Sequence, residues 1–180
     1  ISVSAFLLNR SSDLLVKTVD VLAGRSMFDG FVGENGEEVN ELTDIIRDNN
    51  LIAEYPKTCR DELKIGCSFA TLSADDDIRC RIRFHSAKSA AAVWDGEKGR
   101  IAYGFAITHT APANDLNMWI PSAMNLYTDD AIWVLRRDGQ IWYADRHLHK
   151  MGRPLMVPFI WNPTSSKPFG QSRIKVPIRR

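Results

Sequence analysis

Three arginines alternate with apolar side chains between Ile78 and Phe84. If this segment is a strand, Arg79, Arg81 and Arg83 share one face and the apolar side chains share the other. Such a row of guanidinium groups could follow the phosphates of a nucleic acid or pair with an acidic neighbouring subunit. It could equally form the solvated face of a one-sided sheet, with the arginine stems covering apolar surface. The sequence alone leaves DNA, protein and solvent open.

Histidines and aspartates are the candidate metal ligands. His147 and His149 could point to one side of an extended segment, and His85 or His109 could complete a site. No cysteine or carboxylate has a matching spacing, so we expect surface histidines and no bound metal. The run of three aspartates at 75–77 could attract a divalent cation, but adjacent aspartates are also typical of a turn, which we favour.

Sequence motifs for nucleotide binding are absent. The chain contains neither GxxxxGK[ST] nor GxGxxG, so we expect neither an ATP-driven motor nor a nucleotide cofactor. The pair Gly170-x-Ser172 lacks the second glycine of a nucleophile elbow. No Ser/His/Asp or Cys/His arrangement stands out by its spacing. Spacing alone cannot reveal catalytic sites whose residues come together only in the folded protein. We expect no catalytic residues, no cofactor and no enzyme activity.

The 180-residue chain has a formal net charge of +1, but its charges are unevenly distributed. Residues 29–62 contain ten acidic and three basic side chains, and residues 167–180 contain five basic and no acidic ones. This pattern predicts an acidic helical region and a basic tail. The overall composition, 44% hydrophobic and 25% charged, is ordinary for a globular protein.

Three cysteines, Cys59, Cys67 and Cys80, form no CxxC pair, which favours free thiols in a reducing compartment. No apolar run approaches the length of a membrane span, and no signal peptide is recognisable, so we expect no membrane association. The chain begins at Ile1 and ends on a basic segment. We therefore expect a fragment of a longer protein.

The elements that would position these residues change character at Gly66. Before it, helical periodicity predicts helices at 12–23, 35–50 and 51–65. Pro56 would start the main part of the third helix, and Cys59 and Leu63 would face the core. An acidic side faces away from the apolar side of the second helix.

After Gly66 the period becomes that of strands, with expected strands at 67–72, 78–84, 100–108, 116–120, 131–136 and 140–144. Hairpin loops are expected at 95–99 and 137–139, the second placing Trp133 near Trp142. The predicted fold class is α+β: a helical subregion at 1–66, a mostly antiparallel β-rich subregion at 67–174 and a basic tail at 175–180. We expect one compact domain.

The stretch from Trp142 to Ile174 has the most unusual arrangement of glycine and proline residues. A tight break at Gly152-Arg153-Pro154 precedes a short apolar run that contains Pro158. Because proline donates no N–H group, this run is expected to be an edge or bulged strand. The run ends at Asn162-Pro163. Farther on, Pro168, Gly170 and Ser172 close the stretch, with Gly170 at a conformation that favours glycine and Ser172 as the N-cap of a helix that continues beyond the chain.

The order and spacing of these motif residues resemble the portal proteins of tailed double-stranded-DNA bacteriophages, most closely those of phages of actinobacteria. Further similar segments are 22–31, 49–66, 90–95 and 146–154. In the family's Gly-Arg-x-Pro motif one residue separates arginine from proline, whereas here Arg153 directly precedes Pro154. The resemblance covers most of the chain.

The resemblance implies an N-terminal fragment from the outer wing region of such a portal. Portal proteins form a dodecameric ring at one capsid vertex, through which double-stranded DNA passes. They contact the terminase, the capsid and the neck proteins, in the virion and in the host cytoplasm during assembly. The stem, clip and crown would follow Ser172. The implied role is structural and non-catalytic, with the three arginines meeting a neighbouring subunit or capsid protein.

A competing interpretation is a nucleic-acid-binding domain or a metal-dependent nuclease from a mobile element. It requires carboxylates that converge on a metal ion or a basic groove that binds DNA. A third is a general interaction module with no viral role, which the order of the motifs disfavours.

Overall fold

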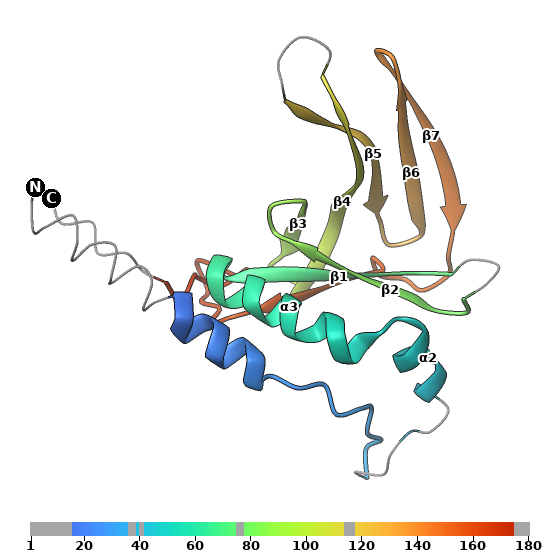
Figure 1. Ribbon diagram of the computed structural model, residues 1–180. Coiled ribbons are helices and arrows are strands. Elements are labelled where there is room, and N and C mark those ends of the chain that lie inside the picture. The colour runs from blue at the N-terminus through green and yellow to red at the C-terminus, as the bar shows by residue number, and fades with distance from the viewer. Residues whose placement is uncertain (1–15, 36–38, 40–41, 75–77, 114–117, 175–180) are drawn as a thin grey trace, which may run out of the picture.

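The computed structural model describes residues 16–35, 39, 42–74, 78–113 and 118–174. In these residues helices come first, and eight strands in two antiparallel sheets follow, which confirms the predicted α+β class. Figure 1 shows three layers: the helices, a three-stranded sheet beside them, and a five-stranded sheet that projects away from both.

The helices agree with the sequence in part. Residues 16–25 are helical, and the predicted start at Ser12 lies outside the described residues. The helix predicted at 35–50 is wrong in extent, because the described part contains only α2 (Thr43–Asp48). The backbone N–H of Val39 donates to the carbonyl of Phe31 at 3.0 Å, so Val39 is held by the extended segment before it.

Helix α3 (Leu51–Ile65) has the predicted bounds, although it runs without interruption through Pro56. Gly66 ends it with φ of +110°, a conformation that side-chained residues avoid. Its buried residues Cys59 and Leu63 pack against Val19 and Ala23 of helix 16–25, as an amphipathic helix predicts. The opposite contacts of α3 are with the three-stranded sheet.

The three-stranded sheet has the order β2-β1-β8 and comprises β1 (Cys67–Ser73), β2 (Arg81–Ser86) and β8 (Met156–Ile160). Strand β8 is an edge strand, as Pro158 predicts. Leu72 donates its N–H to Leu155, and Trp161 donates to Gly66, each at 2.9 Å. Because alternate residues bond across an antiparallel ladder, Pro158 falls at a position whose N–H would point away from β1. The missing donor therefore breaks no bond of the sheet.

The five-stranded sheet is a meander of the strands β3 (Ala90–Asp95), β4 (Arg100–Pro112), β5 (Trp119–Tyr127), β6 (Ala131–Asp138) and β7 (Ile141–Leu148). Both predicted hairpins are present. The predicted proximity of Trp133 and Trp142 is wrong, because Trp133 lies opposite Arg146 and Trp142 lies opposite Arg137. The two-residue turn at Gly139 and Gln140 sets this register. Of the strand predicted at 116–120, residues 116 and 117 lie outside the described residues, and β5 begins at Trp119.

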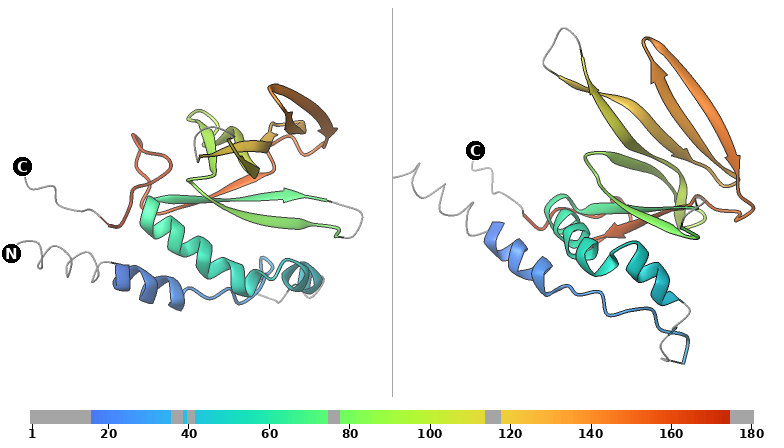
Figure 2. Two further views of the ribbon diagram at one scale, coloured as in Figure 1. Left: turned by 45° about the horizontal axis from the view of Figure 1, so that its top comes forward. Right: turned by 45° about the vertical axis from the view of Figure 1, so that its right-hand side comes forward.

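The two sheets meet over one apolar cluster. Phe69 of β1 and Met156 of β8 pack against Ile101, Ala106 and Tyr127 of the five-stranded sheet. Figure 2 shows the larger sheet rising from this junction, so its base is packed while β5, β6 and β7 extend beyond it. All eight residues of β7 are exposed.

Candidate functional site

The predicted arginine row does not form as one strand face. Strand β2 begins at Arg81, so Arg79 precedes it, in a hollow that Asp44 and Asp48 of α2 also line. Asn49 explains this boundary: it donates to the carbonyl of Cys80 at 2.8 Å and accepts the N–H of Ile82 at 2.7 Å. These bonds hold the start of β2 against the corner between α2 and α3.

Arg81 is half-buried and Arg83 is exposed. The Arg79 end of the predicted row therefore lies beside acidic residues of its own chain. The three arginines do not present one continuous basic surface.

The histidines are not brought together as a metal site. His85 lies in β2 with Nε2 2.9 Å from Thr71 Oγ1, and burial, followed by the charge of Arg83, lowers its pKa. His109 and His147 are exposed on different strands, and His149 donates its backbone N–H to Asp130 at 2.8 Å. Within the described residues no three His, Cys, Asp or Glu side chains gather to hold a metal ion. The aspartate run at 75–77 lies outside the described residues.

The segment 161–174, here called the C-terminal clasp, joins the helices to the sheets. Gln171 donates its N–H to Trp161 at 3.1 Å, and Arg173 donates to Leu63 of α3 at 2.9 Å. The hydroxyl of Ser172 donates to the carbonyl of Lys64 and accepts the N–H of Ile174 at 3.1 Å. The Ser172 hydroxyl thus bonds to backbone groups on both sides, while the helix that it was predicted to cap lies outside the described residues, so this prediction is not tested.

Gly170 adopts the predicted left-handed conformation, with φ of +74°. A Cβ atom here would collide with the carbonyl oxygen of Trp161 and lie 2.8 Å from that of Gly66. The preceding residue, Phe169, has its ring centroid 5.9 Å from Phe69 and 5.8 Å from Trp94. The clasp therefore brings backbone and aromatic rings into close contact.

The remaining motif residues form turns around β8. Gly152 and Asn162 have φ of +64° and +49°, which reverses the chain before and after this strand. Pro154 is buried, whereas the two prolines of the clasp, Pro163 and Pro168, are exposed and half-buried. This arrangement assigns the motif a structural part in the fold.

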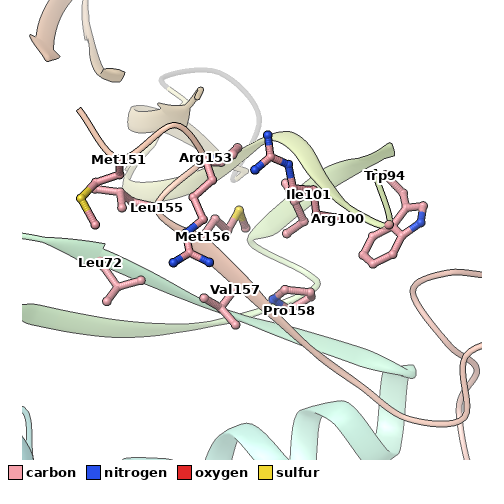
Figure 3. A pocket seen from close by; sticks show the side chains of 12 residues that line it. Leu72, Trp94, Arg100, Ile101, Met151, Arg153, Leu155, Met156, Val157 and Pro158 are labelled. Atoms are coloured by element: carbon pink, nitrogen blue, oxygen red, sulfur yellow. The ribbon is translucent and has the colours of Figure 1, made fainter. Parts of the chain in front are cut away.

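A cavity of about 430 Å³, here called the junction cavity, opens where the two sheets meet. Figure 3 shows Arg153 of the Gly-Arg-Pro turn and Arg100 on its walls, among apolar side chains such as Ile101 and Met156. Arg100 also pairs with Asp129 at 3.7 Å. The described residues that line the cavity include no carboxylate, histidine, cysteine or hydroxyl group that could serve as a base or nucleophile.

The most extensive feature that sequence reasoning missed is one face of the five-stranded sheet, here called the outer sheet face. The strand registers place one set of apolar side chains on it. Its exposed members are Val93, Tyr103, Phe105 and Trp142, and its half-buried members include Met124, Leu126, Trp133 and Leu135. The opposite face holds the small buried residues Gly104 and Ala106, which pack at the junction between the sheets.

The outer sheet face carries two arginines, on β6 and β7, and by the same register Asp95, two residues after Val93 on β3. Arg137 and Arg146 lie on it, opposite Trp142 and Trp133 in the register. The guanidinium of Arg146 stacks 5.3 Å from the ring centroid of Trp133 and pairs with Asp130. The alternation of apolar residues in β4, β5 and β6 was the available sequence signal. It did not reveal which of the two faces would be covered.

Comparison of the sequence with protein-family models and with curated proteins found no match. In the described part of the chain, no helix combines the length and the apolar character needed to cross a bilayer.

Proposed function

We propose that this protein is a structural, non-catalytic component of the portal of a tailed double-stranded-DNA bacteriophage. In that role its copies associate into a ring at one capsid vertex, through which DNA is packaged and ejected. Its partners would be other copies of itself, the terminase, and the capsid and neck proteins. It would reside in the virion, and in the host cytoplasm during assembly.

The observation that carries this proposal is the outer sheet face. Tyr103 is 50% exposed and Trp142 is 41% exposed, on a sheet that projects from the rest of the molecule (Figure 1). A contiguous apolar face that nothing in the described chain covers is typical of a surface used for assembly. A ring component requires such a surface, and an independent catalytic domain does not.

The residues that carry the resemblance support the same proposal. Gly170 and Ser172 hold the clasp against helix α3 and the end of β8, and Gly152 turns the chain into β8. Backbone geometry and packing explain these structural roles. Such roles are expected in a structural protein whose motif residues maintain its fold.

The test is the assembly state of the protein expressed from its own reading frame. Light scattering and negative-stain images should show ring particles with cyclic symmetry. Monomers at every protein and salt concentration would contradict the proposal. So would DNA cleavage that depends on an added divalent cation, which would favour the nuclease interpretation.

A further inference from the structure

We infer that the outer sheet face of one copy packs against the helical side of a second copy, in a head-to-tail contact. This inference rests on the proposed function and names the surfaces through which the copies meet. The partner surface, here called the helical groove, is the apolar hollow between the segment 28–32, α2 and the start of α3. The two surfaces differ in shape and in charge.

The composition of the outer sheet face is that of the core of a protein interface. Interface cores are enriched in tryptophan, tyrosine, phenylalanine, methionine and arginine, and depleted in lysine, aspartate and glutamate. The outer sheet face has aromatic side chains on three strands, with Phe105, Trp133 and Trp142 among them, and its charges are two arginines on β6 and β7 and one aspartate at the β3 edge. Such a face buries large rings and places guanidinium groups where a partner can meet them.

The helical groove supplies a complementary surface on the same chain. It has a volume of about 400 Å³ and is lined mainly by apolar residues, including Phe31 and Ile46. Val32, at 70% exposed, and Ile52, at 65% exposed, stand on its rim. An apolar hollow with exposed aliphatic side chains at its edge can accept the aromatic rings of a flat sheet.

Charge complements shape in this pairing. Asp29 lines the groove, and the exposed Glu34 follows the segment 28–32. Asp44 and Asp48 of α2 line the separate hollow beside Arg79 and pair with Arg47. Over residues 29–48 the sequence has seven acidic side chains and one basic side chain. An acidic rim of Asp29 and Glu34 facing Arg137 and Arg146 of a neighbour gives electrostatic attraction and fixes the orientation of the two copies.

The arrangement of the two surfaces dictates the kind of assembly. The helical groove is lined by residues of the helical layer, and the outer sheet face belongs to the five-stranded sheet. Figures 1 and 2 show the three-stranded sheet between these two layers. A contact between two different surfaces is heterologous, so a pair of copies keeps one free surface of each kind. Repeating that contact closes a ring when the rotation allows it, and otherwise extends a filament.

The experiment uses three single variants of the protein expressed from its own reading frame. Trp142→Ser removes a ring from the outer sheet face, and Ile52→Lys places a positive charge on the rim of the helical groove. Tyr143→Ser is the matched control, because Tyr143 is 55% exposed on the same strand but faces the other side of the sheet. Sedimentation velocity measures the assembly state, and circular dichroism confirms that each variant is folded.

We expect Trp142→Ser and Ile52→Lys each to lower the association constant at least tenfold, and Tyr143→Ser to change it less than threefold. The decisive sample is an equimolar mixture of Trp142→Ser and Ile52→Lys. In it the intact groove of one variant meets the intact sheet face of the other, so the mixture should form dimers that neither variant forms alone. Dimer formation by this route identifies a heterologous contact.

Several outcomes would overturn the inference. Association of Ile52→Lys alone at the wild-type strength would show that the groove is not the partner surface. Unaltered association of Trp142→Ser would remove the outer sheet face from the contact. Ring particles formed by both variants would refute the inference and leave the proposed function standing. Failure of the wild-type protein to associate would overturn both.

Discussion

At the scale of single residues, the glycine of the clasp shows how the motif acts. Gly170 combines a left-handed backbone with a close approach to the carbonyl oxygens of Trp161 and Gly66. The sequence predicts the unusual backbone, because a glycine close to Pro168 and Ser172 is typical of a turn. It does not predict the steric contact, since Gly66 is more than one hundred residues away along the chain and meets Gly170 only after folding.

We expect Gly170→Ala to destabilise the protein by roughly 2 to 5 kcal/mol, from the left-handed backbone together with steric overlap. Urea unfolding followed by tryptophan fluorescence measures the change. Gly96→Ala is the matched control, because a Cβ there meets no atom within 4 Å, and it should change stability by less than about 0.5 kcal/mol. Equal effects of the two substitutions would mean that the clasp is not held as described.

At the scale of elements, local sequence patterns predict some element boundaries, and contacts between residues far apart in the sequence set the others. The bounds of α3 follow from the sequence because apolar periodicity and Gly66 are local signals. The length of α2 does not, because Val39 bonds to Phe31 instead of continuing a helix. The start of β2 depends on Asn49, which lies thirty-three residues from Ile82. A side chain at such a distance leaves no periodic signal in the strand that it limits.

Asn49 therefore gives a prediction about how elements are joined. Its side chain donates to Ile45 and Cys80 and accepts from Ile82, at 2.9, 2.8 and 2.7 Å. We expect Asn49→Ala to destabilise the protein by about 2 to 3 kcal/mol, since partly buried backbone groups lose their partners. The loss would be measured by thermal and urea unfolding.

Asn125→Ala serves as the control for this substitution. Its side chain makes one long bond, to Tyr127 at 3.4 Å, so a change below about 1 kcal/mol is expected. Hydrogen exchange should also show faster opening of β2 in Asn49→Ala. Unchanged protection of β2 would argue that Asn49 does not hold its start.

At the scale of the whole molecule, the sequence predicts the order of helices and strands but not the placement of the two sheets. Alternating residues in β4 and β6 show that both faces carry apolar side chains at some positions. Which face is covered depends on the junction, where Met156 approaches Gly104 closely and fills the space beside it. The small residues Gly104 and Ala106 can be assigned to the packed face only once the fold is known. The outer sheet face, left uncovered, is consequently a property of the assembled fold.

The charge of that face leads to a prediction for the whole assembly. If Arg137 and Arg146 meet an acidic rim, association weakens as salt rises, because ions screen the attraction while the apolar contact persists. Between about 50 and 500 mM salt we expect the dissociation constant, measured by sedimentation equilibrium, to rise several-fold. Arg137→Gln should reduce that salt dependence, whereas Arg136→Gln should preserve it, because Arg136 is exposed on the opposite face of the same strand. Association that strengthens with salt, or an equal effect of both substitutions, would mean that the arginines of the outer sheet face do not meet the acidic helical side of a neighbour.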